Sequence, residues 1–327
     1  MLINKLFSKV YLNISKLFPS NINLFLAKVF KKLHNLSIKS SFSRDFLANI
    51  NIENCNFKIW LMKNDDQAHS VYRPLHDKKI SYETIMIKSL VSTIEKLKAK
   101  NFLDLGSFMG YYACFIAKYF DDKIKVYAIE SNEEYSRYID KSVKINNFEN
   151  VEILNEILSD KNEDLYVHKE GVYNLDEKKT HYQKKLSVTL DEICLRHKIN
   201  PEIIKVDVHG AEGKVLFGSK KILQNNTKII LLELHTSKYL KKFSNGCSRK
   251  KIIEYLLSLD FKCYLISSFR DFEQSVDLQK SFQIRKKFNY IQINLENFDS
   301  IFFDRDQKDQ FIFGCKNNID IQSFEYF

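Results

Sequence analysis

From about residue 80 onward, short apolar runs alternate with amphipathic stretches, and this alternation limits the available folds more than any other feature of the chain. Period and length separate the two kinds of segment. Strands are predicted at 102–105, 125–129, 151–154, 186–190, 203–208, 228–234, 261–266 and 310–315, and helices at 82–99, 111–120, 133–146, 191–197, 211–223 and 249–259. Strands alternating with helices form a mostly parallel sheet with helices on both faces, so the sequence predicts an α/β fold.

The regular alternation indicates one ligand-binding core at residues 81–266, with an extension on each side. In the N-terminal extension, 1–80, residues 1–36 interleave apolar side chains with lysines, which is typical of basic amphipathic helices. We therefore expect a helical extension that packs on the core, serves as an oligomer contact or touches a membrane surface; the oligomeric state stays open. The polar stretch 159–185 is expected to be irregular. Residues 267–327 are expected to complete the sheet edge or to cover the ligand site.

Composition narrows the functional classes. The 327 residues are 44% hydrophobic with only 3 Pro and 8 Gly, which is typical of a packed globular protein. The formal charge of +10 comes from scattered lysines without a long basic block, so we expect no nucleic-acid partner. The six cysteines form no C-x-x-C pair, and the sequence shows neither a membrane-spanning run nor a signal peptide. We expect a cytoplasmic protein.

The glycines point to one ligand site, because five of the eight fall within 104–110 and 210–218. Gly106 and Gly110 lie between the first core strand and its helix, where a tight turn brings backbone N–H groups to a ligand. The loop, which also contains Ser107, is not G-x-G-x-x-G, and Phe108 leaves a dinucleotide pyrophosphate poorly accommodated. Glu130 ends the second strand, where a carboxylate can accept hydrogen bonds from both hydroxyls of an adenosine ribose. S-adenosylmethionine and NAD would both use such a residue.

A second group of polar residues follows two later strands. Asp207 and His209 end a buried strand, and Glu233 and His235 end the next. In open parallel sheets, ligands bind at this carboxyl edge. The sequence therefore predicts that acidic and imidazole groups meet at one rim.

These stretches occur in the order seen in one enzyme family. They are Asp-Leu-Gly-x-x-x-Gly at 104–110, Glu130, Thr-Leu-Asp at 189–191, Lys-Val-Asp-Val-His-Gly-Ala-Glu at 205–212 and Leu-Glu-Leu-His at 232–235. Over roughly residues 82–266 the chain resembles FkbM-type methyltransferases. The sequence departs from their pattern at the bulky Phe108 and Met109, and at His209, where the family usually has Glu.

The resemblance implies a Rossmann-like class I methyltransferase fold, S-adenosylmethionine as donor and O-methylation of sugars or natural products. It implies that Asp104, Gly106 and Gly110 line the amino-acid end of the donor, and Ser107 in the same loop is counted with them. It further implies Glu130 at the ribose, and Ser159 and Asp160 at the adenine edge.

Methyl transfer requires alignment of donor and acceptor and removal of a hydroxyl proton. We expect His235 or His209 to be the base, with Asp207 orienting the acceptor or the donor. Asp207, Glu233 and His235 could instead hold a divalent metal, but their spacing does not demand one, and no metal is expected. His69, Arg73 and His76 lie in a stretch that either folds over the acceptor or is an ordinary surface loop.

The predicted function is therefore S-adenosylmethionine-dependent O-methylation of a hydroxyl on a sugar, a glycan or another small metabolite. The alternatives are a non-catalytic scaffold that retains the fold and an NAD-dependent oxidoreductase. A nucleic-acid methyltransferase is less favoured, because neither an Asn/Asp-Pro-Pro-Tyr nor a Pro-Cys motif occurs.

Overall fold

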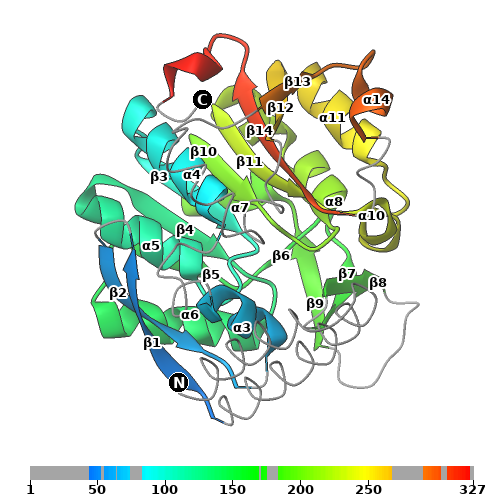
Figure 1. Ribbon diagram of the computed structural model, residues 1–327. Coiled ribbons are helices and arrows are strands. Elements are labelled where there is room, and N and C mark those ends of the chain that lie inside the picture. Colours follow the sequence, from blue (N-terminus) through cyan, green and yellow to red (C-terminus); the bar gives the residue numbers. More distant parts are fainter. Residues whose placement is uncertain are drawn as a thin grey trace, which may run out of the picture.

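An eight-stranded, mostly parallel sheet forms the centre of the protein (Figure 1). The computed structural model describes residues 44–52, 55–63, 65–73, 83–168, 171–174, 183–266, 290–302 and 308–324. The strand order is β13-β12-β14-β11-β10-β3-β4-β5. In chain order these strands are β3 (Asn101–Leu105), β4 (Lys125–Ile129), β5 (Val151–Leu154), β10 (Ile203–Val206), β11 (Ile229–Leu234), β12 (Phe261–Ile266), β13 (Tyr290–Ile293) and β14 (Gln310–Lys316). The predicted α/β fold is confirmed.

Helices cover both faces of this sheet. The helices that pack into one core include α4 (Thr84–Leu97), α5 (Tyr111–Phe120) and α6 (Glu133–Asn146). Those that pack into the other are α7 (Leu190–His197), α8 (Glu212–Phe217), α9 (Lys220–Asn225), α10 (Ser237–Phe243), α11 (Arg249–Ser258) and α14 (Phe298–Phe302). Because the strands are buried on both sides, they are apolar in nearly every position: Phe102 enters the first core and Leu103 the second.

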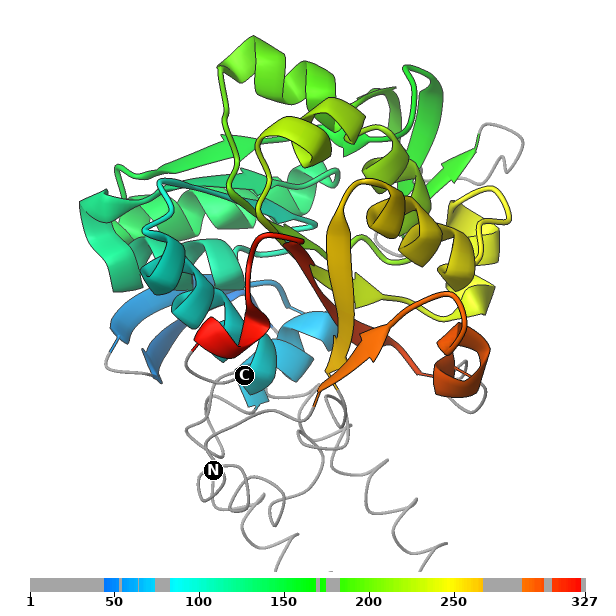
Figure 2. The same cartoon turned by 90° about the horizontal axis from the view of Figure 1, so that it is seen from above.

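The described part of the N-terminal extension differs from the helical expectation. β1 (Phe46–Ile52) and β2 (Cys55–Leu61) form an antiparallel hairpin, followed by α3 (Asp66–Arg73). Every second side chain of the hairpin is buried, the pattern of a strand rather than a helix. Figure 2 shows the hairpin against the side of the molecule that carries α5 and α6. Residues 1–36 lie outside the described residues.

The stretch expected to be irregular contains strands instead. β6 (Ile157–Leu158), β7 (Asp164–His168), β8 (Gly171–Asn174) and β9 (Gln183–Val188) make a small second sheet. Among the side chains that the structure describes in this sheet, Ile157, Leu165 and Val167 form one small buried cluster. The prediction of an irregular segment was therefore wrong.

The helix expected at 211–223 is two helices, because the chain turns at Gly218 and Ser219 between α8 and α9. Asp191 stabilises the second of them: its carboxylate accepts hydrogen bonds from the backbone N–H groups of Lys221 and Ile222. Thr189 and Glu192 form a capping box that starts α7. The Thr-Leu-Asp segment thus makes structural contacts.

The C-terminal region completes the sheet, as expected. β14 enters antiparallel between β11 and β12, and β13 adds an edge strand beside β12. The 3-10 turn Ile321–Ser323 follows. Residues 267–289 are outside the described part, and cover of the ligand site by this region stays a prediction. Among the described residues, no helix is both long and apolar enough to cross a membrane.

Candidate functional site

The loop after β3 is a tight turn that packs closely against the end of β10. Gly106 has a φ of +77°, and a Cβ atom there would lie 1.8 Å from the carbonyl oxygen of Asp207. Only glycine fits a position with this backbone conformation and this close a neighbour. The backbone N–H groups of Gly106 and Ser107 donate to the carbonyl of Ile129 on β4. The loop is therefore fixed against the carboxyl ends of two neighbouring strands.

The remaining loop residues explain the departures from the family pattern. The hydroxyl of Ser107 donates to the carbonyl oxygen of Asp104 at 2.7 Å, so it supports the turn. Phe108 has a φ of +53° and packs edge-on against Tyr135. Met109 is buried in the first core, and Gly110 is the N-cap residue of α5. The two bulky side chains therefore pack into the protein around the loop.

Glu130 lies beside this loop, as predicted. Its two carboxylate oxygens accept hydrogen bonds at 2.8 Å from the backbone N–H groups of Phe108 and Asn132. Burial raises the pKa of the carboxyl to about 7, although both hydrogen bonds favour the charged form. The hydroxyl of Ser131 also donates to Oε1 at 3.4 Å, whereas Oε2 has a second lone pair for a hydroxyl donor. A buried carboxylate joined directly to a glycine loop suits a ribose.

Asp104 belongs to a buried ion pair. Its Oδ1 atom lies 3.1 Å from Nζ of Lys205, its partner in the register of β3 and β10, and both side chains are almost fully buried. Burial alone would lower the pKa of Lys205, but the carboxylates of Asp104, Asp207 and Glu83 outweigh it, and the pKa is raised. The Oδ2 atom of Asp104 has no hydrogen-bond partner among the described residues. Because the Oδ2 atom is buried, a ligand could donate a hydrogen bond to it only by reaching in between the strands.

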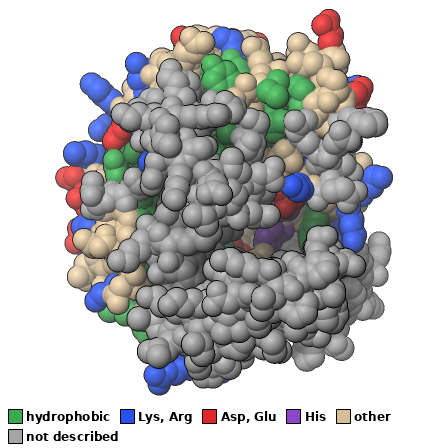
Figure 3. Space-filling model, in the orientation of Figure 1, with side chains coloured by type: hydrophobic (Ala, Val, Ile, Leu, Met, Phe, Trp, Pro, Cys, Tyr) green, Lys and Arg blue, Asp and Glu red, His purple; other side chains and the backbone are tan. Residues whose placement is uncertain are grey.

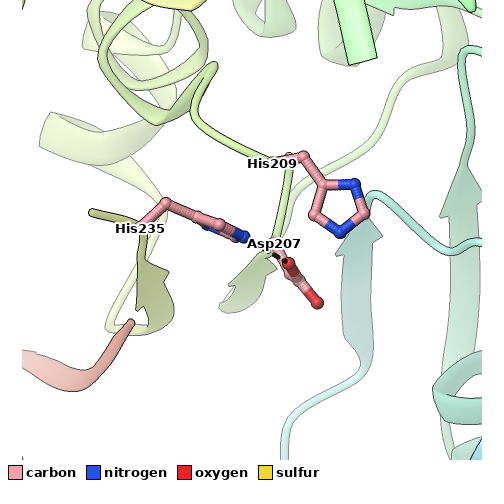
Figure 4. Close-up of side chains that lie close together, drawn as sticks. All are labelled: Asp207, His209 and His235. Carbon is pink, nitrogen blue, oxygen red and sulfur yellow. Dashed lines mark ion pairs between the residues drawn. The ribbon is translucent and has the colours of Figure 1, made fainter. Parts of the chain in front are cut away.

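His235, at the end of β11, faces two carboxylates. Its Nδ1 atom lies 2.8 Å from Oε1 of Glu212, and its Nε2 atom lies 4.0 Å from Oδ1 of Asp207. The Nδ1 contact has the distance of an ion pair but not the alignment of a hydrogen bond to any described residue. Burial alone would lower the pKa of His235, but Glu212 and Asp207 outweigh it and raise the pKa to about 9. Figure 4 shows the imidazole directed at Asp207.

His209 has a different environment. Burial lowers its pKa, and its ring lies edge-on to His235 with 5.3 Å between ring centroids. Its φ of +50° is unusual for a residue with a side chain. Gly210 follows with a φ of +96°, and a Cβ there would meet the backbone of Tyr239. Figure 3 shows a histidine and acidic side chains at the base of a hollow in this face.

The structure brings most of the predicted residues together. The loop residues, Glu130, Asp207, His209 and His235 meet at the carboxyl ends of β3, β4, β10 and β11. Ser159 follows β6, and its hydroxyl contacts Asp160 and Glu163. Asn155, next after β5, bonds instead to the carbonyl of Glu130 at 2.7 Å. Contact of Ser159 and Asp160 with adenine stays a prediction.

Several residues of the site were not predicted. Lys205 could have been suspected, because it is a lone charge inside an apolar run, but its pairing with Asp104 depends on strand order. Asp309 precedes β14 and accepts a hydrogen bond from the backbone N–H of Thr236. Arg249 donates to the carbonyl oxygens of His235 and Leu234. Neither Asp309 nor Arg249 lies in a recognisable motif.

Several sets of side chains could hold a metal. Within each set the ligand atoms lie within 4.8 Å of one another: Asp207 with His209 and His235; Glu233 with His235 and Asp309; and Glu83 with Asp207 and Glu233. The expected trio of Asp207, Glu233 and His235 is thus divided between sets. Absence of a metal remains a prediction. His69 and Arg73 belong to α3, and His76 lies outside the described residues.

Comparison with known proteins places this geometry in a family. Residues 99–263 match the methyltransferase FkbM domain. The structure is similar to methyltransferase FkbM from Methylobacillus flagellatus KT, with 14% identity and a TM-score of 0.39; the likeness covers 66% of this chain but only 44% of that one. It is also similar to an O-methyltransferase from Bacillus cereus in complex with SAH, with 11% identity, a TM-score of 0.40 and coverage of 78% and 93%.

A comparison with curated proteins found no match. The family match spans half of the chain and includes the glycine loop, Glu130, Asp207, His209 and His235. The chain therefore belongs to the methyltransferase FkbM domain family.

Proposed function

We propose that the protein transfers a methyl group from S-adenosylmethionine to a hydroxyl of a neutral sugar, glycan or other small metabolite. The observation that carries the proposal is the pairing of His235 with Glu212, with Nε2 facing Asp207 beside the glycine loop. A histidine oriented by a carboxylate at one nitrogen can take a proton at the other.

The residues at the end of β3 and β4 fit the proposed donor. Gly106 lets the loop approach the backbone of Asp207 closely, which brings the end of β10 beside Glu130, a buried acceptor for the ribose hydroxyls. When bound, S-adenosylmethionine supplies an electrophilic methyl group on a positively charged sulfur. The carboxylates around the site favour a positive charge there. The same carboxylates disfavour an anionic acceptor.

His235 would take the proton of the acceptor hydroxyl at Nε2. The hydroxyl oxygen forms the new carbon–oxygen bond, while the electron pair of the broken carbon–sulfur bond stays on sulfur. Because its pKa is about 9, His235 is largely protonated at neutral pH in the free protein. A positive charge bound beside it lowers that pKa, so donor binding would help to free the base. Asp207 can accept a hydrogen bond from a second hydroxyl of the acceptor, next to the reacting one.

Thermal unfolding with and without ligands tests the proposal. S-adenosylmethionine and S-adenosylhomocysteine should each raise the melting temperature, since a ligand at about 100 times its Kd adds about 2.7 kcal/mol of stability. Methyl transfer to hydroxylated acceptors is then followed by mass spectrometry, with and without a chelator. A shift with NAD alone would favour an oxidoreductase. No shift with any of the three would favour a non-catalytic scaffold.

A further inference from the structure

A side chain from outside the matched domain reaches His209 of the candidate site. Gln67 lies on α3, and its Nε2 atom is 3.0 Å from Nε2 of His209. The matched domain begins only at residue 99. We propose that Gln67 is a positioning residue, which holds His209 neutral with its proton on Nδ1, and that α3 forms part of the acceptor-binding site. The second half of this inference rests on the proposed methyl transfer.

Gln67 is held in place by contacts between its segment and the cofactor loop. Asp65 accepts hydrogen bonds from the backbone N–H groups of Gln67 and Ala68, which fixes the start of α3. The other oxygen of Asp65 accepts from the hydroxyl of Tyr135 at 2.9 Å, and Tyr135 packs on Phe108. Figure 1 shows α3 beside α6, which carries Tyr135. The amide of Gln67 is thus presented from a fixed element.

The same anchoring extends to the hairpin. The backbone N–H of Met62 points at the sulfur of Met109 in the glycine loop, at 3.3 Å. Ala68 and Val71, on α3, are buried in the first core. The segment that carries Gln67 therefore packs on the element expected to bind the donor, as well as on His209.

The contact between the two nitrogens constrains the protonation of His209. An amide N–H can donate to Nε2 only when that nitrogen carries no proton, so the single proton of the neutral ring is on Nδ1. Asp207, Glu212 and Asp309 favour the charged ring, whereas burial and the neighbouring His235 oppose it. Gln67 also disfavours protonation of His209, because a protonated ring would carry an N–H at Nε2, and that N–H would face the N–H groups of the Gln67 amide. His209 is thereby available as a neutral donor.

A neutral His209 complements the other groups of the cluster. One of its ring nitrogens lies within 4.8 Å of a carboxylate oxygen of Asp207 and of a ring nitrogen of His235. In Figure 4, Nε2 of His209 lies on the side of the ring nearer to Asp207, and Nδ1 points away from Asp207 and His235. A hydrogen-bond acceptor at Asp207 and a base at His235, with Gln67 and His209 beside them, suit a substrate with oxygen groups on neighbouring carbons, one reacting and one held. Sugars have that arrangement.

Histidine-selective ¹⁵N NMR tests the proposal without a known acceptor. The ring signals of His209 are assigned with a His209→Asn variant, and tautomer and pKa are followed in the full-length protein. We expect the Nδ1–H tautomer in the wild type. In Gln67→Glu, a carboxylate would accept from Nε2–H and should increase the proton affinity of His209 about tenfold, one pKa unit. Gln67→Ala should give a mixture of tautomers.

Gln224→Glu is the matched control, because Gln224 is also an exposed glutamine on a helix, α9. It should leave His209 unchanged. An Nε2–H tautomer in the wild type, or equal His209 titrations in Gln67→Glu and the wild type, would overturn the proposal. Binding of S-adenosylhomocysteine is measured by calorimetry on the same samples. If the wild type does not bind it, the proposed methyl transfer is contradicted. The NMR result decides the role of Gln67 independently of that outcome.

Discussion

The two histidines of the site differ because their partners differ. Glu212 and Asp207 raise the pKa of His235 to about 9, whereas burial lowers the pKa of His209. Like charges so close together disfavour a doubly protonated pair, so the first proton favours His235. In a reaction that needs a base, the rate is therefore limited by the fraction of His235 that has lost its proton. His209 contributes hydrogen bonding.

Replacement of His235 by alanine tests its role as base. General base catalysis is worth about 10²–10⁴-fold, so kcat of His235→Ala should fall by that order. Binding of S-adenosylhomocysteine should stay within a few-fold of the wild type, because Gly106 and Glu130 are intact. In the wild type, kcat/KM should rise with pH toward about 9, since the free base is required.

The control for this variant is His197→Ala, on α7, where the ring pairs with Glu152 and not with any residue of the site. It should keep full activity. If His235→Ala transferred methyl groups at the wild-type rate while folded, as judged by its melting curve, another group would have to remove the proton.

The residues of the site were predictable where a motif marks a strand end. Gly106, Glu130, Asp207 and His235 follow apolar runs, and parallel strands align such ends at one edge. Gln67 could not be found in this way, because its contact with His209 joins segments 142 positions apart. The pairing of Lys205 with Asp104 requires knowing that β10 lies beside β3, which local periodicity does not reveal.

At the scale of elements, the hairpin β1–β2 is part of the main core. Phe57 packs against Phe115 of α5, and the backbone N–H of Trp60 donates to the hydroxyl of Ser142 on α6. Ile59 is fully buried in the same cluster as α5 and α6. The hairpin therefore holds α3 and Gln67 against the domain.

Substitution of Ile59 by alanine should show this integration. Loss of a buried isoleucine typically lowers the free energy of unfolding by about 2–5 kcal/mol. Because the hairpin shares its core with the domain, urea unfolding should remain one transition, followed by both tryptophan fluorescence and circular dichroism. Ile145→Ala, at an exposed site on α6, should change the free energy far less. Two separate transitions would show that the hairpin unfolds independently.

The elements of the core were predictable because their periods are strong. The strands 125–129 and 261–266 and the helices 111–120 and 133–146 have the predicted bounds. Of the small sheet, the end of β9 was predicted as part of the strand 186–190, whereas β7 and β8 lie in the stretch expected to be irregular. The alternation in 46–61 was present in the sequence, but the prediction extended the helical character of residues 1–36 over it.

For the whole molecule, the site gives folding a definite dependence on pH. The pKa of Glu130 is raised from 4.5 to about 7, so between these values the folded protein keeps a proton that the unfolded chain has released. Stability falls there as pH rises. The pKa of His235 is raised from 6.5 to about 9, so its contribution is complete below 6.5 and is lost as pH rises through 9. Both effects have the same direction.

Urea unfolding across this range measures the sum. Each group accounts for roughly 3 kcal/mol at most, so the free energy of unfolding should decline from about pH 5 to about pH 9. Glu130→Gln should remove the decline below about pH 7, and His235→Gln should reduce the decline above it. Glu149→Gln, at an exposed position between α6 and β5, should leave the profile unchanged. If Glu130→Gln kept the full acidic decline, Glu130 would be ionised in the folded protein throughout, and the pH dependence would arise from other groups.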